Sequence, residues 1–334
     1  MVSAKSSGSI SVIIVNWNQR ELLNDCLCSL SRQSYSDYET IVVDNGSRDN
    51  SVALIKEHFP SVKVVELAEN KGFTGGNAAG LSVADGEFIA LINNDARAEQ
   101  NWLERLVAPM LTEPDVGICA SKIVIDGTEA IDSAGSGLTT AGVGFNRGLG
   151  MDRGLFASPE AIFGACGAAA LYRRSMLEEI GFLDDTFFLY DEDSDLSFRA
   201  QLAGWKCRYV PDAVAHHKGN ATSERLSGLH VYYHTRNLEF VWIKNMPAAL
   251  MVRFFHHKLI QELAAFIYLC LRHGKWASYF HAKIDALKML PGMWRKRRVI
   301  QARRRVSNAY IRSLMTSMFT WGFVRQKIWQ FING

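Results

Sequence analysis

Amide and carboxylate side chains follow directly after an apolar segment of the chain. Residues Phe88–Ile92 are all apolar, and Asn93, Asn94 and Asp95 come next. An uninterrupted apolar run of this length predicts a buried parallel strand, and open α/β sheets bind their ligands at the carboxyl ends of such strands. A carboxylate beside two amides at this place suits a divalent cation that also holds a diphosphate. A turn rich in Asn and Asp that leads into the next helix is the alternative.

A second group of acidic residues stands beside aromatic residues later in the chain. Asp191, Glu192, Asp193 and Asp195 fall within five positions at the start of a predicted helix. Acidic side chains favour a helix N-terminus, because the backbone N–H groups there carry partial positive charge. Capping accounts for one or two of them, so we expect the group to contain a general base.

A Gly-rich stretch contains Gly72, Gly75 and Gly76, and we expect it to be a loop before a helix that ends near Ala84. The spacing does not fit the Rossmann fingerprint GxGxxG, and the Gly-Lys-Ser/Thr of a P-loop does not follow. Glycines there still allow the backbone to approach a diphosphate or a ribose closely, helped by the N-terminus of the next helix. The alternative is a loop that needs glycine only for a positive φ angle.

The elements that would position these residues alternate between strand and helix. The predicted strands are residues 9–15, 39–43, 62–67 and 88–92, and the predicted helices are residues 21–33, 51–58 and the helix that ends near residue 84. This alternation predicts a doubly wound, mostly parallel sheet of the α/β class. Asn, Asp or Gly residues follow each strand, so the polar side chains are expected along one edge of the sheet.

Beyond residue 116 the pattern is less regular. We expect a strand over Val116–Ile125, an irregular Gly-rich segment over residues 133–154, a helix over Tyr172–Ile180 and a late strand over Trp205–Val210. His216 and His217 follow that strand. Histidines are more often structural than metal-binding, so the residues alone leave the role of this pair open.

Composition places the chain among soluble globular proteins. Its 334 residues are 48% hydrophobic and 21% charged, which allows one large α/β domain with an appendage, or two domains. The six cysteines show neither CxxC pairs nor even spacing, which predicts reduced thiols in a reducing compartment. Ile10–Val15 is too short for a signal peptide, and no apolar stretch is long enough for a membrane-spanning helix.

Charge divides the chain into two parts. Residues 230–334 hold 18 Lys and Arg residues against three acidic ones, whereas residues 1–229 hold 19 against 31. The basic part has apolar residues at helical spacing over residues 250–271 and 315–332, and basic clusters at residues 295–298 and 303–305. Cationic and aromatic helices without a spanning segment indicate an interfacial location on anionic lipid. Nucleic-acid binding, a solvated basic face and a dimer interface are the alternatives.

Several motifs, taken in order, resemble family 2 glycosyltransferases of the GT-A fold, and in particular their rhamnosyltransferase-like branch. The resemblance covers about the first 225 residues and rests on the segments 12–18, 42–47, 70–77, 91–95 and 190–196 together with Arg199 and Gly204. It implies a catalytic domain over residues 10–225, after a disordered tail of residues 1–9. The helical, basic residues 226–334 would then associate with the membrane surface.

The resemblance also implies a role for individual residues. Asp44 would read the pyrimidine base of a nucleotide sugar. The full set that would bind the nucleotide sugar is Val15, Asn16, Asp44, Asn45, Gly72, Phe73, Gly75, Asn77, Asn93 and Asn94.

The family's DxD motif corresponds to residues 93–95, with Asp95 at the metal-binding position. The first acid of DxD is replaced by Asn93, which weakens the expected dependence on Mg²⁺ or Mn²⁺ without excluding it. His216 matches the family's late histidine and is the second expected metal ligand. Asp193 falls on the position of the catalytic base, Glu192 would orient the acceptor, and Asp195 with Arg199 would hold the helix in place.

The chemistry that follows is an inverting sugar transfer. A sugar hydroxyl is a poor nucleophile, so a carboxylate must take its proton as it attacks the anomeric carbon. A single base opposite the leaving nucleoside diphosphate gives inversion, and a divalent cation would neutralise the charge on that leaving group.

We expect a dTDP- or UDP-sugar donor, with L-rhamnose from dTDP-rhamnose as one candidate, and an acceptor that is a growing glycan or is linked to polyprenyl diphosphate. The expected location is the inner face of the plasma membrane, and a homodimer is a further possible assembly. A sugar nucleotidyltransferase and a non-catalytic glycan-binding scaffold are the competing hypotheses.

Overall fold

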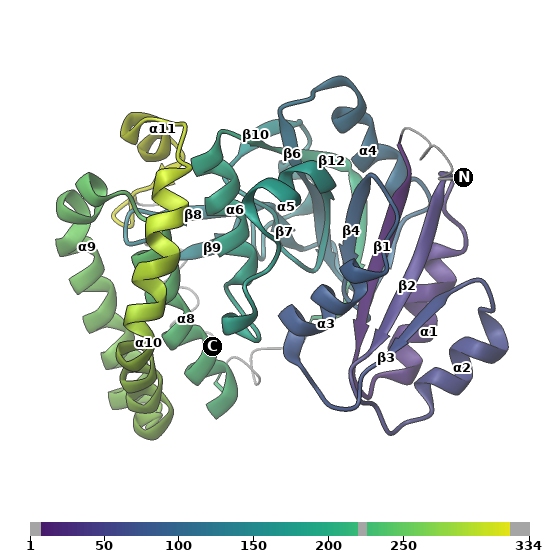
Figure 1. Ribbon diagram of the computed structural model, residues 1–334, viewed down its shortest axis with the longest axis horizontal. Helices are drawn as coiled ribbons and strands as arrows, with labels where there is room; N and C mark the ends of the chain where they lie inside the picture. The colour runs from purple at the N-terminus through teal and green to yellow at the C-terminus, as the bar shows by residue number, and fades with distance from the viewer. Residues whose placement is uncertain (1–7, 220–225, 321–334) are drawn as a thin grey trace. The chain divides into compact units, whose positions relative to one another are not determined.

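The computed structural model describes residues 8–219 and 226–320 and divides them into two compact units (Figure 1). The first unit contains residues 8–136, 146–188 and 205–219, and the second contains residues 137–145, 189–204 and 226–320. The expected disordered tail falls mostly outside the described residues, as does most of the helix expected over residues 315–332. Each unit is described by itself.

A mixed, ten-stranded sheet forms the centre of the first unit, counted over the described residues. Its strand order is β10-β12-β6-β11-β4-β1-β2-β3, with β5 paired to β12 and β7 to β6. The strands are β1 (Ile10–Asn16), β2 (Tyr38–Asp44), β3 (Lys63–Glu66), β4 (Phe88–Ile92), β5 (Ala96–Ala98), β6 (Val116–Ile125), β7 (Ile131–Ala134), β10 (Glu160–Ile162), β11 (Ala169–Arg173) and β12 (Lys206–His217).

The strands β3, β2, β1 and β4 are parallel neighbours, and their register aligns the polar residues at their ends. Asn16 at the end of β1 lies opposite Asp44 of β2, and Asp44 lies opposite Glu66 of β3. The first four predicted strands and the predicted α/β class are therefore confirmed. The polar edge expected from the sequence is present, and Asn16, Asp44 and Glu66 lie side by side along it on neighbouring strands.

Helices cover both faces of this sheet, because successive residues of a strand point to opposite faces. The helices are α1 (Arg20–Leu30), α2 (Ser51–His58), α3 (Gly72–Ser82), α4 (Trp102–Thr112) and α5 (Arg174–Ile180). Val12 and Ile14 belong to one buried core with the apolar sides of α1, α2 and α4. Ile13 and Val15 instead face α3.

The expectation of a loop at residues 72–76 is wrong, because these residues form the first turns of α3. Gly72 has a φ angle of +72°. A Cβ atom on Gly76 would lie 2.6 Å from Cγ1 of Val15, and one on Gly80 would lie 2.5 Å from Cγ2 of Ile13. The glycines therefore let the helix lie directly on the sheet, and this packing outweighs their low helix propensity.

The Gly-rich segment expected to be irregular contains short strands. They are the last residues of β7, then β8 (Ser136–Thr139) and β9 (Gly144–Asn146). The helix expected from Tyr172 begins at Arg174, because Tyr172 and Arg173 are the last residues of β11. Both pair with β4, and Tyr172 also pairs with β6. The late strand continues past Val210 to His217, since its second half pairs with β6 and β5.

The second unit is mainly helical (Figure 1). Its helices are α6 (Glu192–Ala203), α8 (Gly228–Asn245), α9 (Ala248–Phe266), a π-helical turn (Ile267–Arg272), α10 (Trp276–Ala302) and α11 (Asn308–Ser313). A small sheet of order β13-β8-β9 includes β13 (Met315–Thr316). Within the described residues, none of these helices has the length and apolarity needed to cross a bilayer.

Asp195 is the centre of the helix packing in this unit. Its carboxylate is fully buried and accepts hydrogen bonds from Arg199 Nε at 2.9 Å, Lys244 Nζ at 2.8 Å and Asn245 Nδ2 at 2.8 Å. A buried carboxylate is stable only when it is paired and hydrogen-bonded. Asp195 thus joins α6 to the end of α8, which is the structural role expected for it.

Candidate functional site

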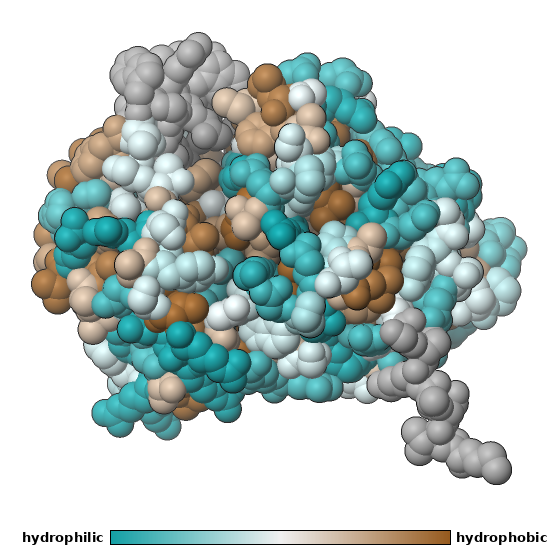
Figure 2. Space-filling model, turned by 90° about the horizontal axis from the view of Figure 1, so that it is seen from above, coloured by the Kyte–Doolittle hydropathy of each residue, from teal (hydrophilic) through white to brown (hydrophobic). Residues whose placement is uncertain are grey.

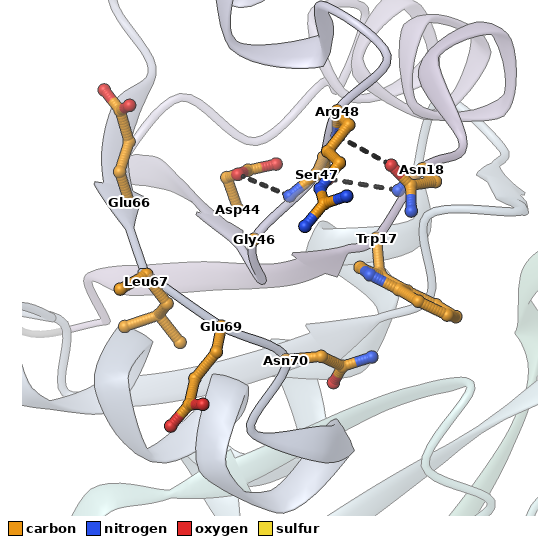
Figure 3. Close-up of a pocket in the computed structure, with 11 residues that line it drawn as sticks. Trp17, Asn18, Asp44, Gly46, Ser47, Arg48, Glu66, Leu67, Glu69 and Asn70 are labelled. Carbon is orange, nitrogen blue, oxygen red and sulfur yellow. Dashed lines mark hydrogen bonds between the residues drawn. The ribbon is translucent and has the colours of Figure 1, made fainter.

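A cavity lies at the edge of the sheet where β1, β2 and β3 end (Figure 3). Its volume is about 540 Å³. The residues that line it are Trp17, Asn18, Asp44, Gly46, Ser47, Arg48, Glu66, Leu67, Ala68, Glu69 and Asn70. Of these, sequence reasoning singled out only Asp44. The others lie at or after strand ends, and those within residues 12–18, 42–47 and 70–77 also belong to the motif segments named above.

One carboxylate oxygen of Asp44 has no hydrogen-bond donor among the described residues. Its Oδ2 atom accepts a hydrogen bond from the backbone N–H of Ser47 at 3.0 Å. Its Oδ1 atom is buried and accepts none from the described residues. A buried oxygen without a donor costs free energy, so a ligand that brings an N–H or O–H group to it would be stabilised. Trp17 lines the same cavity with its side chain half exposed, which leaves its ring free for stacking.

Asn45 and Asn77 use their amides within the protein. Asn45 Nδ2 donates to Asn70 Oδ1 at 3.0 Å and to the Gly72 carbonyl at 3.1 Å, while its Oδ1 accepts from the Lys71 N–H at 2.8 Å. Asn77 Nδ2 donates to the Phe73 carbonyl at 2.8 Å. These predicted nucleotide ligands therefore fix the chain before α3 and the first turns of α3.

Two other predicted ligands connect the cavity's edge to the end of β4. Asn94 Nδ2 donates to Asn16 Oδ1 at 2.8 Å, and Asn16 is fully buried. Val15 and Phe73 are half-buried residues of β1 and α3. Gly75 lies on the first turns of α3, where a Cβ atom would come within 2.6 Å of Lys71 Cβ.

A second cluster lies at the carboxyl ends of β4 and β12. The Nε2 atom of His217 is 3.2 Å from Asp95 Oδ1 and 3.3 Å from Asn93 Nδ2. The Nδ1 atom of His217 is 2.7 Å from Asp132 Oδ2. Asp132 was not predicted; it belongs to β7, just before the Gly-rich segment, and carries no sequence signal of its own.

The choice of His216 as the partner of Asp95 is not supported by this geometry. His216 and His217 are successive residues of β12, so their side chains leave the strand on opposite sides. His216 Nε2 lies 3.2 Å from Glu99 Oε1, whereas His217 lies against Asp95. His217 is therefore the histidine that lies beside Asp95.

The electrostatics of this cluster are those of an imidazole between two carboxylates. Burial alone would lower the pKa of His217, but its hydrogen bonds and charge interactions with Asp132 and Asp95 outweigh burial and raise that pKa to about 10. Burial in turn would raise the pKa of Asp95, but His217 lowers it on balance.

The same residues fit a divalent cation in part. A histidine that binds a metal through one nitrogen usually donates its other N–H to a carboxylate, and Asp132 is placed for this role. Asp95 and His217 would supply one oxygen and one nitrogen ligand. Within the described residues no group of three or more His, Cys, Asp or Glu side chains could hold a metal ion. Further ligands would have to come from amides, water or the substrate.

The acidic group of the second unit begins α6 after a strained segment. Tyr190 and Asp191 have φ angles of +70° and +64°, which non-glycine residues rarely adopt. Asn237 of α8 donates from Nδ2 to the carbonyls of Leu189 at 2.9 Å and Tyr190 at 2.8 Å. His234 Nδ1 lies 2.8 Å from Asp191 Oδ2. Asn237 and His234 were missed by sequence reasoning, because their contacts are distant in the chain.

Glu192 and Asp193 occupy different environments. Glu192 is buried, and burial together with the negative charge of Asp193 raises its pKa well above the ordinary value. Its Oε2 atom has no hydrogen-bond partner among the described residues. Asp193 is half-buried, and its Oδ1 atom accepts the backbone N–H of Ser194 at 2.6 Å. The pair therefore contains a carboxyl group that tends to keep its proton beside a more exposed carboxylate.

Comparison with known proteins identifies the family. The family model described as "Glycosyl transferase family 2" matches residues 11–181, about half of the chain. The chain therefore belongs to glycosyl transferase family 2, an inverting family.

Two curated relatives differ in how much of the chain they match. An uncharacterized glycosyltransferase of Nostoc sp. is 34% identical over 129 residues, which is 37% of this chain and 40% of the relative. An N-acetylglucosaminyl-diphospho-decaprenol L-rhamnosyltransferase of Mycobacterium tuberculosis is 23% identical over 293 residues, 80% of this chain and 86% of the relative. The chain thus spans less than half the length of the first of these.

Solved structures support the predicted fold class. The crystal structure of GalNAc-T7 with UDP, GalNAc and Mn²⁺ superposes with a TM-score of 0.59 at 17% sequence identity, covering 71% of this chain and 48% of that one. At this identity the likeness shows the fold alone, which is GT-A-like.

Proposed function

We propose that the protein transfers a sugar from a nucleoside-diphosphate donor to an acceptor hydroxyl with inversion at the anomeric carbon. The observation that carries the proposal is the composition of one sheet edge. There, a cavity lies at the ends of strands of one sheet, and it is lined by Asp44, whose Oδ1 atom has no hydrogen-bond donor among the described residues. The Asp95–His217 pair lies at the ends of strands of the same sheet. Family membership supports the same reaction class.

The residues of the first unit would bind the donor. Asp44 Oδ1 would accept a hydrogen bond from the ring N–H of uracil or thymine. In these two pyrimidines that N–H lies between two carbonyl groups. Trp17 would stack on the base. A divalent cation, Mg²⁺ or Mn²⁺, held by Asp95 and His217 would neutralise negative charge on the leaving diphosphate.

The residues at the start of α6 would serve the acceptor. Asp193 would take the proton of the attacking hydroxyl, since its side chain is only half-buried and can be reached by an acceptor. Glu192, whose raised pKa favours the protonated form, would donate a hydrogen bond to an acceptor oxygen and orient it. For the donor we propose a dTDP- or UDP-sugar, with dTDP-rhamnose tested first because a matched relative is an L-rhamnosyltransferase.

We also propose that residues 226–334 bring the enzyme to the inner face of the plasma membrane, where the acceptor would be a growing glycan or one linked to polyprenyl diphosphate. Apolar side chains are exposed along α9, and brown atoms are visible along the left margin of Figure 2, where α9 lies. The exposed large apolar residues of α9 and of the π-helical turn after it are Val252, Phe255, Leu259, Ile260, Leu263, Ile267 and Leu271. Such a face beside excess basic charge suits an anionic bilayer.

The test is a screen of dTDP- and UDP-sugars with and without Mn²⁺, read as release of the nucleoside diphosphate in the presence of acceptor lipid. Release that depends on the acceptor supports the proposal. Pyrophosphate formed from a sugar phosphate and a nucleoside triphosphate would indicate a nucleotidyltransferase instead. Glycan binding without consumption of any donor would indicate a scaffold.

A further inference from the structure

A second cavity, distinct from the sites above, lies within the helical unit. Its volume is about 730 Å³. It is lined by residues from the start of α9, the last turns of α10, the segment after α10 and the start of α11: Ala248, Ala249, Trp294, Arg297, Arg298, Gln301, Arg304 and Asn308.

The lining of this cavity is strongly cationic. Arg297, Arg298 and Arg304 contribute three guanidinium groups, and no acidic residue lines the cavity. The acidic side chains between residues 226 and 320 form ion pairs with lysines that do not line the cavity. Glu239 and Glu262 pair with Lys258 and Lys283, and Asp285 pairs with Lys288. The positive charge in the cavity is therefore not neutralised by this part of the chain.

The three arginines differ in how many of their guanidinium N–H groups are already hydrogen-bonded within the protein. Arg297 is buried and donates to the carbonyls of Ile243 at 2.7 Å and Met246 at 2.6 Å, so it forms the wall. Arg304 uses Nη1 in a hydrogen bond to Asn308 Oδ1 at 2.8 Å. Arg298 is exposed and makes no ion pair or hydrogen bond with the described residues. Arg298 and the remaining nitrogens of Arg304 can therefore bind an anion bidentately.

The start of α9 adds backbone donors to the same cavity. Helix α9 is 19 residues long and has no side-chain cap at its N-terminus. The N–H groups of Leu250 and Met251 bond to the Pro247 carbonyl, whereas those of Ala248 and Ala249 have no intrahelical acceptor. Open N–H groups and the positive end of the helix dipole favour phosphate.

An exposed apolar strip leads away from the cavity along each helix. On α9 the strip continues from Ala248 at helical spacing through Val252, Phe255, Leu259 and Leu263. On α10 it continues from Trp294 through Leu287, Ile284 and Phe280. Side chains three or four residues apart share one side of a helix, so the cavity lies at one end of both strips.

We propose that this cavity binds the phosphate group of a phosphorylated lipid, whose hydrocarbon chain lies along the exposed apolar side chains of α9 and α10. The guanidinium and backbone N–H groups supply the donors that a phosphate oxygen needs, and the apolar strips give a reason for a lipid rather than free phosphate. The lipid can be a membrane phospholipid or a polyprenyl-linked acceptor, because both present a phosphate ester on an aliphatic chain. The site does not depend on the donor chemistry proposed above.

The test measures binding of soluble probes to the full-length protein by calorimetry. The probes are geranyl phosphate, dihexanoyl phosphatidic acid, geraniol and inorganic phosphate. We expect a phosphorylated lipid to bind more tightly than geraniol and inorganic phosphate. The tighter of the two phosphorylated lipids identifies the source.

Matched variants separate a site from general charge attraction. Arg298→Gln should weaken binding about tenfold, because it removes a charge-assisted contact. Arg295→Gln changes the same charge one turn away, at an exposed residue outside the cavity lining, and should leave binding within about twofold. Arg304→Gln provides a second variant if the first misfolds.

Equal losses for Arg298→Gln and Arg295→Gln, or equal affinity for inorganic phosphate and geranyl phosphate, would overturn the proposal. Hydrolysis of the nucleotide sugar without acceptor should be the same in the wild-type protein and in Arg298→Gln. Failure of the lipid site is thereby distinguished from failure of the proposed transferase activity.

Discussion

The Nε2 atom of His217 lies 3.2 Å from Oδ1 of Asp95. Because the opposite ring nitrogen of His217 is held by Asp132, the imidazole is fixed with Nε2 toward Asp95. The two residues are far apart in the chain and meet because β4 and β12 end at the same edge of the sheet.

This pair predicts which histidine supports catalysis. His217→Gln should lower metal-dependent kcat/KM about 10- to 100-fold, and Asp132→Asn should have a smaller effect in the same direction. His216→Gln is the matched control and should retain most activity, because His216 contacts Glu99 instead. The measurement is a titration of sugar transfer with Mn²⁺. A larger loss in His216→Gln than in His217→Gln would return the metal role to His216.

Asp193→Asn should reduce kcat by about 10²- to 10⁴-fold while the affinity for the donor stays nearly unchanged, because the amide cannot accept the proton of the attacking hydroxyl. Donor affinity is measured by calorimetry with the nucleoside diphosphate, and kcat by product formation. Glu178→Gln, on the exposed side of α5, serves as the control for loss of a negative charge. Turnover like that of the wild-type protein would exclude Asp193 as the base.

Asp44→Asn should weaken the binding of UDP or dTDP about tenfold, because an amide presents a donor where the ring N–H of the base needs an acceptor. The change should cost little stability, since the Oδ1 atom has no partner among the described residues. Calorimetry with UDP and ADP measures the change in affinity, and urea denaturation measures the change in stability. Equal weakening for the two nucleotides would argue that Asp44 does not read the base.

Asn237→Ala should destabilise the protein by about 1–3 kcal/mol, because it leaves two carbonyl groups of a strained segment without their donor. Urea denaturation measures the change in the free energy of unfolding. The same variant should lower kcat, since the segment leads directly into Glu192 and Asp193. Unchanged stability and unchanged kcat together would show that the φ angles of Tyr190 and Asp191 do not depend on α8.

Low pH should lower the folding stability of the helical unit, because it protonates Glu262. Burial raises the pKa of this carboxyl group, but Lys258 and Lys283 outweigh burial and lower it from 4.5 to about 2. A pKa that is lower in the folded state contributes stability above its unfolded value, and this contribution is lost as the pH falls from about 4.5 toward 2. Thermal melting as a function of pH should show this loss in the wild-type protein and a shallower one in Glu262→Gln. Parallel curves would contradict the prediction.

The family and the fold class were predictable from the sequence because their signals are local. The alternation of apolar strands with amphipathic helices, and the Asn, Asp and Gly residues after each strand, depend only on neighbouring residues. Ser51–His58 and Phe88–Ile92 have the predicted bounds. Asp95 was found in the same way, because it comes within three residues of the end of a strand, whereas Asp44 was found through the resemblance of the segment 42–47.

Only the tertiary structure decided the contacts between residues distant in the chain. It placed His217 instead of His216 beside Asp95, added Asp132 behind it, and made residues 72–76 a helix because Gly76 packs on Val15. It also buried Glu192 and gathered arginines of α10 and the segment after it around the start of α9. Pairing between strands and packing between helices set these positions, and neither can be derived from a local pattern of residue types.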